Sequence, residues 1–146
     1  MSNIIFIDDD KTSIEEFILA CKDINGKKVE FFDNTGEETK KFIRENHEKI
    51  DLIILDIMFV GDGENYYGGY AEGVIFYKSF LQSINNLLTI IFTNKIPVNF
   101  REDFIKYGVD HSEIEVIEKN KITIIDFKEK IKSLLSSLNK RRIIKT

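Results

Sequence analysis

Five short apolar segments alternate with five segments of helical periodicity, and this alternation constrains the fold more than any other feature of the sequence. The apolar segments, which we predict to be strands, are residues 3–8, 27–34, 51–57, 87–94 and 113–119. The predicted helices are residues 11–23, 36–49, 69–84, 99–108 and 123–139. Strict alternation of strands and helices is typical of a parallel sheet with helices on both faces. We therefore predict an α/β fold.

The length and composition of the chain indicate one domain. The 146 residues are enough for a single core of about 3–138, followed by a basic C-terminal tail, 139–146. The net charge of −4 does not favour direct nucleic-acid binding. No apolar run predicts a membrane span, and no leader for export is recognisable. The single cysteine, Cys21, excludes an internal disulfide and is compatible with a cytoplasmic protein.

Polar side chains follow four of the five predicted strands. The first strand ends at Asp8, Asp9 and Asp10, the third at Asp56, the fourth at Thr93 and Asn94, and the fifth at Glu118 and Lys119. In open parallel sheets the functional groups lie just beyond the carboxyl ends of the strands. If these strands are neighbours, the side chains converge on one crevice that holds carboxylates, a hydroxyl and an ammonium group.

The chemistry of this group of side chains can be argued from their types. Clustered carboxylates repel each other at neutral pH and need a cation. Oxygen ligands without a nearby His or Cys favour Mg²⁺ over zinc. A carboxylate can also act as a nucleophile toward a phosphoryl group, and a hydroxyl and a lysine can bind the phosphoryl oxygens. The crevice therefore has the groups that a Mg²⁺-dependent phosphoryl acceptor requires.

Four motifs, in this order and each at a strand end, resemble the receiver domain of two-component response regulators. They are FIDDDK, DLIILDIM, IIFTN and VIEKN, and the similarity extends over about residues 3–138. The resemblance implies a flavodoxin-like fold, a five-stranded parallel sheet in the order 2-1-3-4-5. It also implies a signalling domain rather than an enzyme, one that catalyses only its own phosphorylation and dephosphorylation.

The resemblance assigns roles to individual residues. Asp56 would accept the phosphoryl group, and Asp8, Asp9, Asp56 and the backbone carbonyl of Met58 would hold Mg²⁺. Thr93 would be the hydroxyl that moves toward the phosphoryl group, and Lys119 the lysine that pairs with it. The phosphoryl donor would be a sensor histidine kinase, a phosphotransfer protein or a small phosphodonor. The downstream partner would be a protein, and a homodimer is left open.

The sequence departs from the family pattern around these residues. A glycine-rich loop, 61–70, replaces the usual short turn with its proline, so that Gly73 is the 17th residue after Asp56. The residue after Lys119 is Asn120 rather than proline, and Val116 replaces the usual aromatic. We expect the loop to affect access to Asp56, and we expect the usual aromatic relay to be altered.

Two other functions remain open. A pseudo-receiver would have the same fold and would bind a partner without phosphorylation. The segment FIDDDKT also fits the start of haloacid-dehalogenase-like phosphatases, in which Asp8 would be the nucleophile and Asp10 the acid/base. That interpretation leaves Asp56 without a role. The chain would be either a single-domain regulator or part of a longer protein.

Overall fold

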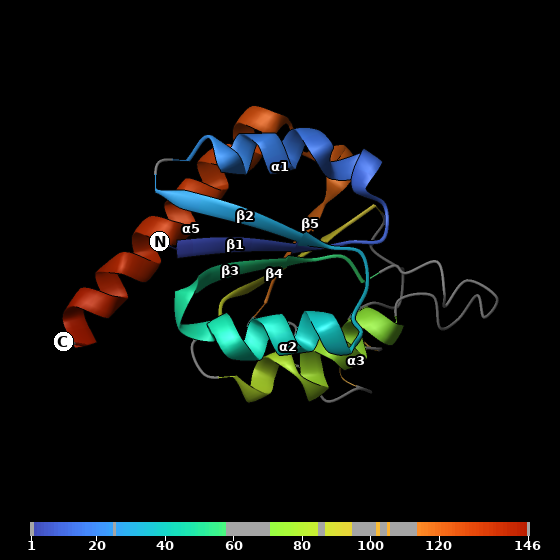
Figure 1. Cartoon of the computed structure of the whole chain (residues 1–146). Coiled ribbons are helices and arrows are strands. Elements are labelled where there is room, and N and C mark those ends of the chain that lie inside the picture. Colours follow the sequence, from blue (N-terminus) through green and yellow to red (C-terminus); the bar gives the residue numbers. More distant parts are fainter. Residues whose placement is uncertain are drawn as a thin grey trace.

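The computed structural model describes residues 2–24, 26–57, 71–84, 87–94, 102, 105 and 114–145. Strands and helices alternate over residues 2–93, and a helix follows the last strand, as the periodicity predicted (Figure 1). The elements are β1 (Ser2–Ile7), α1 (Glu15–Lys22), β2 (Lys27–Phe32), α2 (Glu37–Asn46), β3 (Ile50–Leu55), α3 (Ala71–Ser79), β4 (Thr89–Thr93), β5 (Glu115–Glu118) and α5 (Ile124–Lys145). The predicted helix 99–108 lies almost wholly outside the described residues, and the loop 61–70 lies entirely outside them.

The five strands form one parallel sheet in the order β2-β1-β3-β4-β5. This order confirms the predicted flavodoxin-like topology. It places β1 and β3 at the centre, each flanked by a strand on both sides. The residues that follow β1, β3, β4 and β5 therefore meet at one edge of the sheet, which we call the carboxyl edge.

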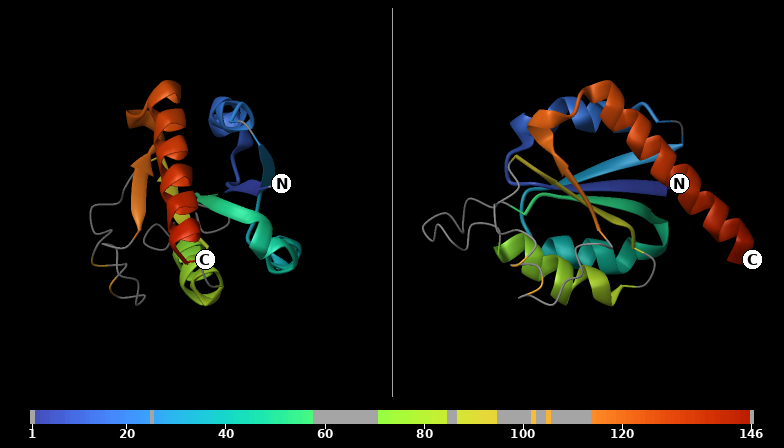
Figure 2. Two further views of the ribbon diagram at one scale, coloured as in Figure 1. Left: turned by 90° about the vertical axis from the view of Figure 1, so that its left-hand side faces the viewer. Right: turned by 180° about the vertical axis from the view of Figure 1, so that it is seen from behind.

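Helices cover both faces of the sheet, with α1 and α5 on one face and α2 and α3 on the other (Figures 1 and 2). Alternate residues of the central strands point to opposite faces, as a pleated strand requires. Ile4, Phe6, Leu52 and Ile54 belong to the core beneath α1 and α5. Ile5, Ile7, Ile53 and Leu55 belong to the core beneath α2 and α3. Burial on both faces explains why β1 and β3 are apolar without alternation.

The first helical segment buries side chains at the i, i+3, i+4, i+7 spacing of one helix face. In the first helical segment Ile14, Phe17, Ile18 and Cys21 are all buried. That segment begins as a 3₁₀ turn, Lys11–Ile14, and continues as α1. The third helix is shorter than predicted, because a 3₁₀ turn, Leu81–Ser83, follows the end of α3. The last helix is longer and continues to Lys145, so part of the predicted tail is helical.

The opposite edge of the sheet contains an ion pair between a half-buried lysine and a buried aspartate. Lys27 Nζ lies 2.7 Å from Asp51 Oδ2, and the Asp51 side chain is 2% exposed. The register between β1 and β3 shifts between Asn3 and Ile4, so that Asp51 is an extra residue in β3. Lys27 begins β2, and the pair therefore links β2 to β3 across β1.

No helix in the described part of the chain is both long and apolar enough to pass through a membrane.

Candidate functional site

Asp8 and Asp56 are the first residues after the two central strands, and the sheet hydrogen bonds hold both of them. The Asp8 N–H donates to the Phe32 carbonyl at 3.0 Å, and the Asp56 N–H donates to the Ile7 carbonyl at 2.9 Å. The backbone of each aspartate is therefore still part of the sheet, while its side chain lies at the carboxyl edge. The structure places the two carboxylates next to each other, as the predicted strand order required.

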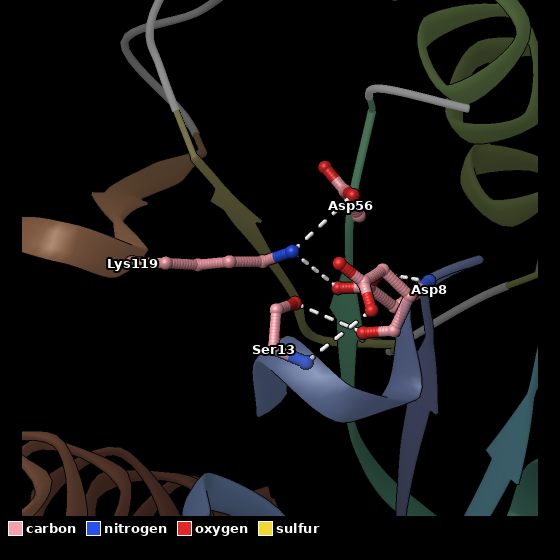
Figure 3. Close-up of polar contacts among 5 residues, drawn as sticks. Asp8, Ser13, Asp56 and Lys119 are labelled. Atoms are coloured by element: carbon pink, nitrogen blue, oxygen red, sulfur yellow. Dashed lines mark hydrogen bonds and ion pairs between the residues drawn. The ribbon is translucent and has the colours of Figure 1, made fainter. Parts of the chain in front are cut away.

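Lys119 lies between these carboxylates (Figure 3). Its Nζ atom is 2.5 Å from Asp8 Oδ2 and donates a hydrogen bond to Asp56 Oδ2 at 3.3 Å. All three side chains are buried, with exposed fractions of 2% for Asp8, 3% for Asp56 and 6% for Lys119. A buried charge is costly unless it is paired, so the ammonium group partly offsets the repulsion between the two carboxylates.

An aromatic cluster lies beneath the lysine. Lys119 Nζ is 6.0 Å from the centre of the Phe92 ring. Phe92 packs against Phe17 and Phe127, and all three pairs of ring centroids are 4.8–4.9 Å apart. These rings belong to the core that α1 and α5 cover. The site is therefore polar at the carboxyl edge and apolar below, which keeps water away from the charged groups on that side.

Burial raises the pKa of Asp8 from 3.8 to about 7. This value is the net result of several causes: the nearby Asp56 carboxylate adds to the effect of burial on the pKa, whereas Lys119 and the Asp10 N–H oppose it. The Asp10 N–H donates to Asp8 Oδ1 at 2.9 Å. A raised carboxyl pKa means that the folded protein disfavours the ionised form of Asp8. A bound cation would favour that ionised form.

Asp8, Asp9 and Asp56 form an acidic group that suits a hard metal ion. Each offers one carboxylate oxygen, and these oxygens lie within 4.8 Å of one another. Two of the three side chains are buried and Asp9 is half-buried. A set of carboxylate oxygens is the donor set that Mg²⁺ prefers, so the residues fit the predicted ion. Met58, the fourth predicted ligand, lies outside the described residues.

Thr93 ends β4 at the same edge and pairs with Glu118, the residue before Lys119. Its side chain is fully buried, and its hydroxyl has no hydrogen-bond partner among the described residues. A buried hydroxyl without a partner costs free energy and needs an explanation. A phosphoryl oxygen at the site would give the hydroxyl an acceptor.

Asp10, which the phosphatase alternative requires as acid/base, has a structural role. Asp10 Oδ1 accepts from the Ser13 N–H at 3.4 Å, and the Asp10 carbonyl accepts from the Ser13 hydroxyl at 2.9 Å. Asp10 is exposed and caps the 3₁₀ turn, which is the position where aspartate is preferred.

Two further residues distinguish this site. Val116 is half-buried and packs against the cluster of Ile57, Val74, Ile91 and Ile114, so a branched aliphatic side chain stands where the resemblance expects an aromatic one. Gly73 lies in close contact with the backbone of Asp56 and Ile57, which no pattern in the sequence predicted.

Comparison with solved structures identifies the fold. The chain is similar to a CheY-like response regulator receiver domain protein from Methanospirillum hungatei JF-1, with a TM-score of 0.69, 20% identity and coverage of 97% of this chain and 98% of that one. It is also similar to the signal receiver domain of a putative Luxo repressor protein from Vibrio parahaemolyticus, with a TM-score of 0.71, 16% identity and coverage of 99% and 98%. A two-component response regulator from Clostridium difficile gives a TM-score of 0.67, 19% identity and coverage of 95% and 99%.

No protein-family model and no curated protein matches the sequence. The structural matches nevertheless cover almost the whole chain, and the first two of these three structures are receiver domains. The chain therefore has the fold of the response regulator receiver domains.

Proposed function

We propose that this protein is a response regulator receiver that accepts a phosphoryl group on Asp56 in a Mg²⁺-dependent reaction. The single observation that carries the proposal is the arrangement at the carboxyl edge: two buried carboxylates share one buried ammonium, and Thr93 at the end of β4 has a buried hydroxyl without a hydrogen-bond partner among the described residues. The receiver fold makes this arrangement more specific than an acidic cluster on an arbitrary fold. We place the protein in the cytoplasm, where Cys21 stays reduced.

The proposed transfer balances as a simple displacement. An Asp56 carboxylate oxygen forms a bond to phosphorus, and the bond from phosphorus to the donor breaks. The leaving group is a histidine imidazole when the donor is a sensor histidine kinase or phosphotransfer protein, and acetate when the donor is acetyl phosphate. Water later cleaves the aspartyl phosphate to restore the carboxylate and release inorganic phosphate.

The residues of the site would divide this work. Asp8, Asp9, Asp56 and the Met58 carbonyl would hold Mg²⁺, which when bound neutralises charge between the carboxylates and the incoming phosphoryl group. Lys119 would turn from Asp8 to the phosphoryl oxygens, and the Thr93 hydroxyl would donate to one of them. These two movements alter the ends of β4 and β5, and a partner protein would recognise the altered surface.

The test is the intact mass of the protein after incubation with acetyl phosphate and Mg²⁺. We expect one phosphoryl group on the wild type, none without Mg²⁺ and none on Asp56→Asn. Asp10→Asn is the matched control, because it removes an exposed carboxylate two residues from Asp8 and keeps a side chain that can cap the turn. We expect it to be phosphorylated like the wild type.

Other outcomes would favour the alternatives. No adduct from acetyl phosphate or from histidine-phosphorylated donor proteins would contradict the proposal and favour a pseudo-receiver. Steady release of phosphate that survives Asp56→Asn and is lost in Asp8→Asn would favour the phosphatase.

A further inference from the structure

Gly73 lies in the first turn of α3 and is in unusually close contact with the end of β3. A Cβ atom built on Gly73 would lie 2.4 Å from the Ile57 Cα and 3.0 Å from both the Asp56 carbonyl oxygen and the Ile57 Cβ. Real Cβ atoms essentially never come within 3.0 Å of another heavy atom. The α3 backbone therefore approaches the Asp56–Ile57 peptide at a distance that only glycine permits.

The backbone of Asp56, which Gly73 approaches, is also held by a hydrogen bond of the sheet. The Asp56 N–H donates to the Ile7 carbonyl of β1 at 2.9 Å. The backbone of Asp56 and Ile57 is therefore in contact both with β1, through this hydrogen bond, and with the first turn of α3. Since the nearest atoms belong to the main chain, no change of side-chain rotamer can relieve a clash there.

Both elements resist the displacement that a side chain at position 73 would require. Val74, the next residue of α3, is fully buried and packs in the cluster that contains Ile57, Ile91 and Ile114. Phe76 is buried in the core beneath α2 and α3. Moving α3 away from the sheet would open these contacts, so the strain is shared with the end of β3, where Asp56 lies.

We propose that Gly73 is a positioning residue for the phosphoacceptor site: the absence of a side chain lets α3 hold the Asp56 backbone where its carboxylate meets Lys119 and the acidic group. This inference rests on the proposed function of Asp56. A small displacement of the Asp56 backbone would disturb these contacts, because the Lys119–Asp56 contact is 3.3 Å and the three carboxylate oxygens lie within 4.8 Å of one another. A misplacement of about 1 Å in such a site costs about 100-fold in rate.

The test compares Gly73→Ala with two matched variants. Gly36→Ala makes the same chemical change at the N-cap of α2, where the new Cβ would meet the end of the Asn34 side chain and no backbone atom. The Asn34 Oδ1 accepts from the Gly36 N–H at 2.8 Å, so the local cost of this variant lies at the start of α2. Val74→Ala weakens the packing of α3 without adding an atom next to Asp56. Three quantities are measured for each: Mg²⁺ affinity by calorimetry, the amide resonances of Asp56 and Ile57 by NMR, and the rate of adduct formation with acetyl phosphate.

For Gly73→Ala we expect shifted Asp56 and Ile57 resonances without Mg²⁺, Mg²⁺ binding weaker by about tenfold and adduct formation slower by about tenfold or more. Gly36→Ala should stay within about twofold of the wild type in all three measurements. Val74→Ala should lower the stability to urea and stay within about threefold of the wild type in Mg²⁺ affinity and rate. A merely structural role of Gly73 would not produce this separation.

The positioning role is overturned if Gly73→Ala binds Mg²⁺ like the wild type with unshifted Asp56 and Ile57 resonances, or if Val74→Ala loses as much Mg²⁺ affinity. If Gly73→Ala unfolds in buffer, all four proteins are measured in about 1 M trimethylamine N-oxide, which favours the folded state. If Gly73→Ala stays unfolded in trimethylamine N-oxide, Gly73 is required for folding and the positioning role is rejected. A wild type that forms no adduct would contradict the proposed function, while Mg²⁺ affinity and the amide shifts would still decide the role of Gly73.

Discussion

Replacing Asp8 with asparagine should stabilise the metal-free protein at neutral pH, even though it removes an ion pair. Burial and the Asp56 carboxylate raise the pKa of Asp8 from 3.8 to about 7. The folded state therefore binds the Asp8 proton more tightly than the unfolded state does. The stability that this group contributes is complete below about pH 4 and is lost as the pH rises to about 7.

The magnitude follows from the two pKa values. At pH 7 the shift corresponds to an unfavourable contribution of about 4 kcal/mol to folding, and at pH 5 to about 2 kcal/mol. Asparagine removes this unfavourable contribution, but it also removes the Asp8 carboxylate that pairs with Lys119. The ammonium of Lys119 then still has the Asp56 carboxylate at 3.3 Å. We therefore expect a net stabilisation of about 1–2 kcal/mol at pH 7, and a difference between variant and wild type that grows by about 2 kcal/mol from pH 5 to pH 7.

The assay is urea unfolding in the presence of EDTA at these two pH values, with Asp10→Asn as the control. Asp10 is exposed, and its replacement should change the unfolding free energy little at either pH. A difference between Asp8→Asn and the wild type that does not depend on pH would refute the reasoning. So would an Asp8→Asn protein that is less stable than the wild type at pH 7, because the ion pair with Lys119 would then outweigh the cost of burying the charge.

Three further predictions follow from other contacts. Mg²⁺ should raise the melting temperature of the wild type, since an ion at ten times its dissociation constant adds about 1.4 kcal/mol to the free energy of unfolding. The increase should be much smaller for Asp56→Asn, and equal increases would mean that the ion binds elsewhere. Asp51→Asn should lower the free energy of unfolding in urea by about 1–3 kcal/mol, because it leaves the half-buried ammonium of Lys27 without the carboxylate at 2.7 Å. The double variant with Lys27→Met should recover part of this loss. Burial raises the pKa of Cys21 to about 12, so its thiol should react with a disulfide reagent near pH 8 only as fast as the protein unfolds. A fast reaction in the folded protein would contradict the buried position of Cys21.

Most of the fold could be predicted from the sequence, because its determinants are local. The apolar runs of β1 and β3 reflect burial on both faces of the sheet, and the spacing of Ile14, Phe17 and Ile18 follows one face of a helix. The order of the strands was not local information. It came from the resemblance of four strand-end motifs to receiver domains, and the topology of the sheet confirms it.

The contacts that position the site could not be predicted, because they join residues that are far apart in the chain and follow no periodicity. Gly73 appears in the sequence as one of several glycines near a loop, and only the packing of α3 on β3 distinguishes it. The pairing of Lys27 with Asp51 depends on a register shift between β1 and β3. Neither a shift of register nor a close helix–strand approach leaves a pattern in one sequence.

The two edges of the sheet differ in how many carboxylates accompany each ammonium group, and this difference is relevant to function. At the edge of Lys27 and Asp51, one carboxylate meets one ammonium at 2.7 Å. At the carboxyl edge, Asp8 and Asp56 share the ammonium of Lys119, and Asp9 adds a third carboxylate nearby. A buried charge that is incompletely paired costs folding free energy. Among the described residues three carboxylates and one ammonium gather at the carboxyl edge, and there the pKa of Asp8 is raised. The same arrangement would favour a divalent cation, so the cost of ionising Asp8 and the proposed Mg²⁺-dependent chemistry arise from one group of side chains.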